Sequence, residues 1–511
     1  MWHPTRSLRA SLLASSASAF RPRRGALATL VSSVRDIRFW TTAIIVAVIV
    51  GALASAAFVP VLALLVLSGV VALVALHPRN AVIALALASP FYDLAVIQVS
   101  GVADIRILEV LWAVAAVSLM WRISSGAETR FVAPPRWFTL GIGALAGWFF
   151  VAALASGAGL RPLIEAVQTG YLVVIAYLVA GVVSGTTSGE LLRWLRPWAV
   201  VMSLVLLLSL GGYVLGFVPV AQTIVKVPEM SVEYAANAVL VQDSGAAQVQ
   251  ISRLSVLNLG PVGTAAALVS ILIVALAFAL SDAGHKSARL AWLVMGSGGL
   301  VLLLTYSRAG WALAIVAAAL LMLAARSRKA TITLSLFALA LAVFGSLPSV
   351  ASRVEDFANV GEGSYQAHAR MWVTAAYMIS EHPIFGWGPG MYAEEANAMD
   401  INSWMATDIS ADQPHNWLLE ISAETGVVGG IIVIALVGTI LIYGWRRLKN
   451  AQLPVLAVWV ATGAYVAMNL TLNAFRTEMM WVWFGAVIGF SAWQSQVDTT
   501  AAPEEEDSCA S

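Results

Sequence analysis

The chain has 511 residues, of which 60% are hydrophobic and only 11% are charged. A soluble domain averages roughly 45–50% apolar and about 25% charged residues, so a lipid bilayer has to solvate the apolar excess here. The formal net charge of +1 gives no indication of nucleic-acid binding. The single cysteine, Cys509, excludes an intramolecular disulfide and a Cys/His site of the zinc-finger kind.

The two ends of the chain differ in charge from the apolar middle. Residues 1–38 carry seven arginines and one acidic residue, a composition found in transit peptides and, around SLLASSASAF, in weak signal cores. Because that apolar stretch is short and rich in serine, we expect a disordered cytoplasmic extension. The final stretch, 494–511, contains PEEED and is expected to be an acidic cytoplasmic tail.

Between these ends, residues 39–493 are expected to form the membrane domain of an all-α polytopic integral membrane protein with about 12–14 transmembrane helices. A spanning helix needs about 20 apolar residues. Pro90 and Asp93 interrupt one of the candidate segments, 81–99, which argues against a regular span there. The apolar segments are 39–58, 61–76, 81–99, 107–121, 137–155, 163–183, 197–217, 260–281, 290–306, 310–325, 331–347, 417–443, 454–472 and 480–493.

The placement of Lys and Arg predicts the orientation, because loops on the cytoplasmic side carry an excess of positive residues. With the N-terminus in the cytoplasm and alternating sides, 21 of the 29 Lys and Arg residues fall on the cytoplasmic side and 8 on the outer side. The C-terminus is then cytoplasmic as well. Two outer segments, 218–258 and 348–414, are longer than ordinary connections. The second holds nine acidic residues together with apolar stretches, so we expect a partly helical loop that folds against the membrane.

A turn carrying Arg308 is predicted within the apolar stretch from Leu290 to Ala325. As one helix, these 36 residues would be about 54 Å long, against a hydrocarbon core of ~30 Å. The chain therefore has to reverse, and TYSRAGW is the natural turn. Both flanks are basic and predicted to be cytoplasmic, which places Arg308 at the outer surface. It is there either as a functional residue or as an arginine reaching lipid phosphates.

The outer loop contains QAHARMWVTAAYMISEHPIFGWGPGMY (366–392). Residues 369–381 have helical character, and the residue before Pro383 disfavours continuation of a helix. Arg370 lies near the start of this helix, where a surface salt bridge is the alternative to a functional role. Gly386, Gly388 and Gly390 predict a flexible turn whose backbone N–H groups can face a ligand.

A third segment, ADQPHNWLLEISAETGVVGG (411–430), leads into a predicted span. Asp412 is expected to cap the helix and Pro414 to occupy an early helical position. His415 then falls on the first exposed turn, above the hydrocarbon core, while Glu420 and Glu424 share one helix face. A lone interfacial histidine is often a bystander, but here it converges with Arg308 and Arg370 on one leaflet.

These motifs together resemble the O-antigen ligase and O-antigen polymerase (Wzy-type) superfamily of bacterial envelope glycan enzymes. The pattern is SRAGW, then an arginine followed by HPIFGWGPG, then PHNWLLEISAETGVVGG, and order and spacing match over roughly residues 253–430. In that family an arginine followed by a Gly/Pro-Asn turn often comes earlier. Here ISRLSVLNLGPVG offers Arg253 without a Pro-Asn pair, so Arg253 matches less closely than Arg308 or Arg370.

The resemblance implies that an oligosaccharide or polysaccharide moves from a polyprenyl diphosphate carrier to an acceptor hydroxyl, on the outer face of the bacterial cytoplasmic (inner) membrane. Arg308 and Arg370, assisted by Arg253, would bind the diphosphate, because the planar guanidinium suits phosphate oxygens. His415 would be the general base, with Asn416, Glu420, Glu424, Gly386, Gly388 and Gly390 in support. No D-x-D motif occurs, so we expect neither a metal nor another cofactor.

Two questions stay open at the level of sequence. A ligase uses a glycolipid acceptor and a polymerase uses another carrier-linked repeat, and no residue in the chain decides between them. The alternative from another class is a polytopic transporter or a lipid-linked glycan flippase. A transporter should carry ionisable residues near the bilayer midplane, whereas the charged residues here cluster at the outer rim.

Overall fold

The structure is a computed structural model, and the residues that it describes are 60–91, 96–99, 103–215, 221–226, 239–243, 246–256, 259–281, 285–325, 327–345, 363–399 and 413–501. The chain divides into two units, Met1–Val70 and Val71–Ser511. The predicted extension 1–38, the predicted span 39–58 and the end of the predicted tail beyond Ala501 lie outside the described residues.

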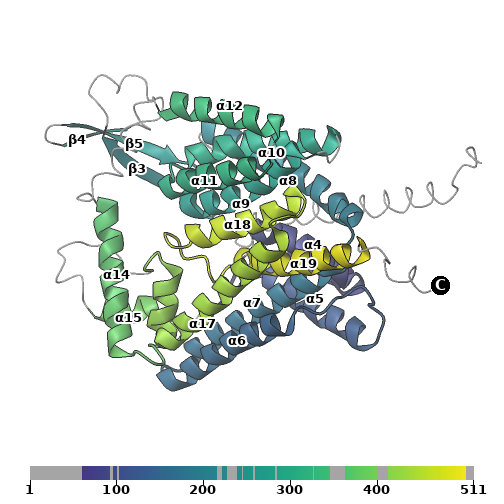
Figure 1. Cartoon of the computed structure of the whole chain (residues 1–511). Coiled ribbons are helices and arrows are strands. Elements are labelled where there is room, and N and C mark those ends of the chain that lie inside the picture. The colour runs from purple at the N-terminus through teal and green to yellow at the C-terminus, as the bar shows by residue number, and fades with distance from the viewer. Residues whose placement is uncertain are drawn as a thin grey trace, which may run out of the picture. The chain divides into compact units, whose positions relative to one another are not determined.

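Long helices make up most of the described chain, and short strands occur in two of the connections (Figure 1). The elements are α3 (Pro60–Leu76), α4 (Pro78–Ala88), β1 (Val96–Val99), β2 (Ala103–Arg106), α5 (Ile107–Ser124), α6 (Arg136–Ser156), α7 (Leu160–Ser184), α8 (Ser188–Val214), β3 (Ala221–Lys226), β4 (Val239–Asp243), β5 (Ala246–Arg253), α9 (Gly260–Leu280), α10 (His285–Leu304), α11 (Arg308–Ala325), α12 (Arg328–Gly345), α14 (Gly363–Glu381), α15 (Tyr392–Ala398), α17 (Trp417–Leu448), α18 (Leu453–Met468) and α19 (Glu478–Ala501).

Eight helices of the described part are long and apolar enough to cross a membrane, namely α5, α6, α7, α8, α9, α10, α11 and α17. A shorter apolar helix, α18, adds to them. The protein is thus an all-α polytopic membrane protein, as the sequence predicts. The total of 12–14 spans stays a prediction, because parts of the chain lie outside the described residues.

The most buried of these helices is α9, which is apolar on all sides and packs against α10, α11 and α18. A helix that is hydrophobic all round belongs inside a bundle rather than at its surface. A second contact group joins α7 to α6 and α19, and α17 packs against α6 and α19. These helices support the outer turns that carry the candidate site.

Two parts of the structure differ from the sequence prediction. The candidate segment 81–99, in which the sequence already argued against a regular span, does not continue as one helix, because α4 ends at Ala88 and a 3₁₀ turn follows over Ser89–Phe91. Pro90 lies in that turn, and proline lacks the N–H that a continuing helix needs. The antiparallel pair β1–β2 and the three-stranded sheet β3–β5–β4 were also not predicted.

One break interrupts the longest helix, α17. Gly426 has φ = 74° and ψ = 175°, which is not helical, so the preceding carbonyls lose their helical partners. The carbonyl of Ala423 accepts a hydrogen bond from the N–H of Trp387 at 3.1 Å, and that of Glu424 accepts one from Gly388 at 2.9 Å. Inside a membrane every backbone polar group needs such an internal partner.

The loop that contains Trp387 and Gly388 also bonds to the residue that follows the break. The N–H of Val427 donates to the carbonyl of Pro383 at 2.8 Å. The indole of Trp148, on α6, donates to the carbonyl of Thr425 at 2.8 Å. We call residues 382–390 the glycine loop; it is fixed to the break in α17 by three backbone hydrogen bonds.

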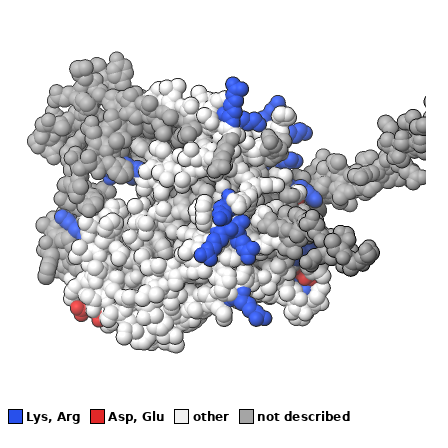
Figure 2. Space-filling view, viewed as in Figure 1, with Lys and Arg blue, Asp and Glu red and all other residues white. Residues whose placement is uncertain are grey.

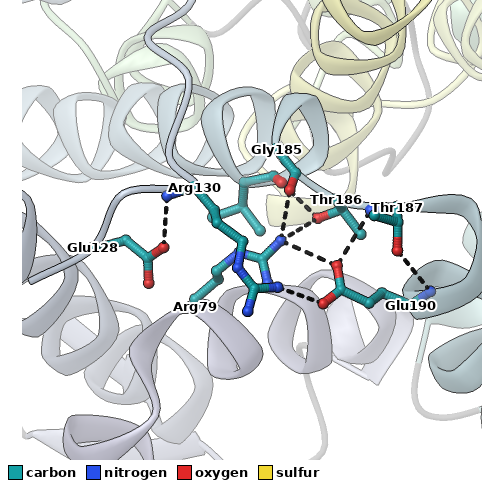
Figure 3. Close-up of polar contacts among 8 residues, drawn as sticks. Arg79, Glu128, Arg130, Gly185, Thr186, Thr187 and Glu190 are labelled. Atoms are coloured by element: carbon teal, nitrogen blue, oxygen red, sulfur yellow. Dashed lines mark hydrogen bonds and ion pairs between the residues drawn. The ribbon is translucent and has the colours of Figure 1, made fainter.

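Connections that the sequence assigns to the cytoplasmic side contact one another. Arg79 donates to the carbonyl of Gly185 at 2.9 Å and pairs with Glu190 at 3.5 Å, and Arg130 pairs with Glu190 at 2.6 Å (Figure 3). Most Lys and Arg visible in Figure 2 lie in the right-hand half of the view, away from α14 and α15, which are on the left in Figure 1.

Gly426→Ala should destabilise the protein. A left-handed conformation costs an L-residue about 1–2 kcal/mol, and a Cβ here would lie 2.0 Å from the carbonyl oxygen of Ile384. Thermal unfolding of the purified protein in detergent measures the loss. The matched control is Gly438→Ala on the same helix, where no heavy atom lies within 4 Å, and it should unfold at the wild-type temperature or slightly above. Equal midpoints for the two variants would contradict the account of the break.

Candidate functional site

The turn between α10 and α11 carries the first candidate residue, Arg308, as the sequence predicts. Thr305 is fully buried, and its hydroxyl accepts the N–H of Ser307 at 3.2 Å. The hydroxyl of Ser307 in turn accepts the N–H of Gly310 at 3.3 Å, in the manner of a helix cap. Arg308 is therefore the first residue of α11, at a helix N-terminus whose dipole favours anions.

Arg253 lies against this same turn, although more than fifty positions separate it from Arg308. The guanidinium Nε of Arg253 donates to the carbonyl of Thr305 at 2.9 Å, and the N–H of Leu254 donates to the carbonyl of Leu304, also at 2.9 Å. Both bonds fix the end of β5 to the end of α10. The structure thus brings two of the predicted arginines together at one turn.

The third candidate, His415, lies just before α17. The helix begins at Trp417 with Asn416 as its cap, whose side-chain oxygen accepts the N–H groups of Leu418 at 3.1 Å and Leu419 at 3.2 Å. The predicted helix start was therefore too early. His415 precedes the cap instead of lying on the first turn, and Asp412 lies outside the described residues.

A residue that the sequence reasoning missed, His368 on α14, connects these groups. Its ring lies 5.2 Å from that of His415, centroid to centroid, at an angle of 72°. Burial, His415 and Arg308 together lower the pKa of His368. The signal was present in the sequence as a histidine two positions before Arg370, in QAHAR.

Backbone strain marks the two turns of the site. Among the described residues, Tyr306 (φ = 50°) and His415 (φ = 48°) are the non-glycine residues with positive φ. Such conformations cost about 1–3 kcal/mol and cluster at functional sites. One stands in the turn that carries Arg308, and the other is the candidate base itself.

Arg370 lies on α14, two residues after His368 and at the margin of the face that packs on α17. Of the neighbouring residues, Met371 and Ala375 are buried, and the indole of Trp372 donates to the carbonyl of Pro414 at 3.1 Å. That bond ties α14 to the turn of His415. α14 and α15 contact one another and α17 (Figure 1), so residues 363–399 of the outer loop fold against a membrane helix, as expected.

Comparison with known proteins relates this part of the chain to a described family. Residues 290–434 match the family model described as O-antigen ligase. The match confirms the resemblance to the O-antigen ligase superfamily. It covers the Arg308 turn, α14, the glycine loop and His415, whereas Arg253 lies before it. A search of curated proteins found no match.

The glycine loop, which lies within the matched residues, has a structural role that differs from the expected one. The N–H of Gly386 donates to the carbonyl of His382 at 3.0 Å, and that of Gly388 donates into the α17 break. Gly386, Gly388 and Gly390 all have positive φ. A Cβ on Gly390 would lie 2.5 Å from the side chain of Glu165. The N–H groups of Gly386 and Gly388 are therefore bonded within the protein instead of facing a ligand.

Glu420 and Glu424 belong to a buried ionic cluster beneath the site. Glu420 is 7% exposed and accepts a hydrogen bond from the amide of Asn473, while Glu424 is 1% exposed and pairs with Arg476. Arg476 also pairs with Glu165 on α7 at 3.2 Å. The cluster links the α18–α19 connection to α7 and α17. The sequence signal for it was the set of charged residues at the predicted outer ends of apolar segments.

Arg476→Ala should lower stability strongly, because it leaves the buried carboxylate of Glu424 without its cation. Breaking a buried pair typically costs about 3–5 kcal/mol. The matched control is Arg161→Ala, whose pair with Glu394 is more than half exposed on both sides and should contribute at most ~1 kcal/mol. Thermal unfolding in detergent compares the two variants. An Arg476→Ala protein as stable as Arg161→Ala would show that the cluster does not support the fold.

Proposed function

We propose that this chain is a glycosyl-transfer enzyme of the bacterial cytoplasmic membrane. It moves an oligosaccharide or polysaccharide from a polyprenyl diphosphate carrier to a hydroxyl of a glycan or glycolipid acceptor, on the outer face, with both termini in the cytoplasm. The observation that carries the proposal is the convergence of Arg308 and the histidines 368 and 415, all within the region that matches the O-antigen ligase family, with Arg253 bonded to the turn that carries Arg308.

The turn between α10 and α11, which carries Arg308 and is bonded to Arg253, is suited to a diphosphate; we call it the arginine turn. Arg308 stands at the N-terminus of an 18-residue helix, and unbonded N–H groups at such an end attract phosphate. Guanidinium groups add a planar set of donors that matches phosphate oxygens and stays charged at any physiological pH. Arg253 donates through Nε to the carbonyl of Thr305, which keeps its guanidinium at the turn that carries Arg308. Arg370 would complete the diphosphate site from α14.

His415 is suited to accept the proton of the acceptor hydroxyl. Burial lowers the pKa of His415 below its ordinary value of 6.5, so its imidazole is neutral at pH 7 and free to take a proton. As the pH falls through this lowered pKa, the imidazole becomes protonated and the base is lost. Transfer should therefore persist somewhat below pH 6.5 and decline in more acidic solution.

The reaction balances with these groups alone. The acceptor oxygen forms a bond to the anomeric carbon, and the bond from that carbon to the diphosphate oxygen breaks with its electron pair. The hydroxyl proton passes to His415. The arginines offset the charge that grows on the departing diphosphate, which is already a good leaving group and requires no general acid.

Substitution of Arg308 and of His415 should separate binding from chemistry. Arg308→Ala removes a charge-assisted contact, a class worth roughly 1.5–3 kcal/mol, so the lipid donor should bind about 10- to 100-fold more weakly. Arg308→Lys should rescue this only partly. His415→Ala should leave donor binding nearly intact while transfer falls about 10²–10⁴-fold. Donor binding and single-turnover transfer to a sugar acceptor are measured in nanodiscs.

Arg289→Ala and His382→Ala are the matched controls, because Arg289 lies near the opposite end of α10 and His382 is exposed at the end of α14. Both should bind donor and transfer like the wild type, and EDTA should not reduce transfer. Wild-type transfer by His415→Ala would refute the assignment of the base. Loss of donor binding in that variant would make His415 a phosphate ligand instead.

A further inference from the structure

His368 has a position that the proposed reaction does not yet use. It lies on α14 next to His415, and the pKa of its imidazole responds to both His415 and Arg308. His368 is therefore in ring contact with the candidate base and close enough to Arg308 for its charge to lower the pKa of His368. The indole bond from Trp372, one turn further along α14, to the carbonyl of Pro414 holds this distance.

The imidazole of His368 contains a buried ring nitrogen. Its Nδ1 atom is buried and has no hydrogen-bond partner among the residues that the structure describes. A buried nitrogen without a partner costs free energy. Such an atom in a native structure calls for a role, and a neighbouring histidine that gains a proton during the reaction would supply the missing donor.

We propose that His368 is a positioning residue of the transfer site, whose neutral imidazole accepts an N–H from His415 once His415 has taken the acceptor's proton. This inference rests on the proposed function for its chemistry, although the coupling of the two histidines can be tested without it. No covalent bond of His368 changes. The proton moves from the acceptor oxygen to a nitrogen of His415, and the N–H of the resulting imidazolium is shared with His368.

The electrostatic surroundings favour this division of roles. Burial is the largest cause that lowers the pKa of His368, followed by the charges of His415 and Arg308. For His415 burial is the cause. Two half-buried imidazoles beside an arginine cannot both be charged without repulsion, and we assign the neutral form to His368 when His415 is protonated. A neutral imidazole is then available to accept a hydrogen bond.

Several other charged groups lie on the elements around the pair. On α14 itself Arg370 follows two positions later, about 200° round the helix from His368. From α17, Glu420 is buried and bonded to Asn473, and Glu424 is paired with Arg476. At the arginine turn, Arg253 donates to the carbonyl of Thr305. Arg308 is the cation whose charge lowers the pKa of His368, and a bound diphosphate would offset that charge.

The test compares His368→Phe and His368→Gln in the full-length chain in nanodiscs. Phenylalanine keeps the ring packing and removes the acceptor, whereas the glutamine carbonyl can still accept from an imidazolium. The matched controls are His382→Phe and His382→Gln, because His382 also packs edge-to-face against an aromatic ring, Trp387, with centroids 4.1 Å apart, but lies outside the pair. Histidine NMR titration and single-turnover transfer against pH are the two measurements.

In His368→Phe the titration midpoint of His415 should move to lower pH, because its protonated form loses a partner, and the acidic limb of the transfer profile should move with it. Loss of a hydrogen bond to a charged group should slow transfer about 10- to 100-fold. His368→Gln should fall between this variant and the wild type. Donor binding and both His382 variants should be unchanged.

An unchanged His415 midpoint in His368→Phe, with a wild-type pH profile, would overturn the inference even if glycan transfer is confirmed. A slower rate without any shift of the profile would also overturn it, because a purely structural role predicts that result. The third outcome is that the His415 midpoint shifts in His368→Phe but the wild-type protein itself transfers no glycan. That result would support the histidine pair and refute the proposed function.

Discussion

The backbone of α17 cannot remain unbonded where it breaks inside the membrane. Gly426 interrupts the helix, and the bilayer offers no water to the carbonyls that lose their partners. The glycine loop supplies the N–H groups of Trp387 and Gly388, and Trp148 supplies its indole. This requirement fixes the end of α14 to a membrane helix. The position of His368 against His415 follows from that attachment and from the Trp372–Pro414 bond.

Charge is arranged in two layers on the outer side of the protein. The site contains Arg253 and Arg308 with two histidines whose pKa values burial lowers, a combination that attracts an anionic carrier and leaves the imidazoles neutral. Beneath it, Glu420 and Glu424 are satisfied by Asn473 and Arg476. The buried carboxylates therefore have partners of their own within the protein.

Much of this could be predicted from the sequence, for physical reasons that differ from element to element. The turn at Arg308 followed from length, since one helix could not contain Leu290 to Ala325 within a bilayer. The spans followed from hydropathy. The break at Gly426 could not be found in this way, because a glycine inside an apolar run has no distinctive pattern. The start of α17 was misplaced because Asp412 and Asn416 are both good caps, and only the structure shows which one is used.

The sequence motifs named most residues of the candidate site, but they did not indicate which of these residues contact one another. Arg253, Arg308, Arg370 and His415 were identified from motifs, while His368 was not, because a histidine beside a motif arginine becomes meaningful only when α14 is placed against the turn at 413–416. The reverse holds for Gly386 and Gly388. Their motif predicts a ligand-facing turn, but their N–H groups are bonded to His382 and to α17. The sequence does not indicate which residues, distant from one another along the chain, form hydrogen bonds.

The most direct test of the central claim is a structure of the full-length protein in nanodiscs with a non-transferable polyprenyl diphosphate analogue that carries a sugar. The account predicts the diphosphate at the N-terminus of α11, in contact with Arg308 and Arg253, with the anomeric carbon on the side of His415. A diphosphate bound instead at the small polar cavity lined by Arg106, Glu109, Glu165 and Arg476, with Arg308 contacting only lipid, would contradict it.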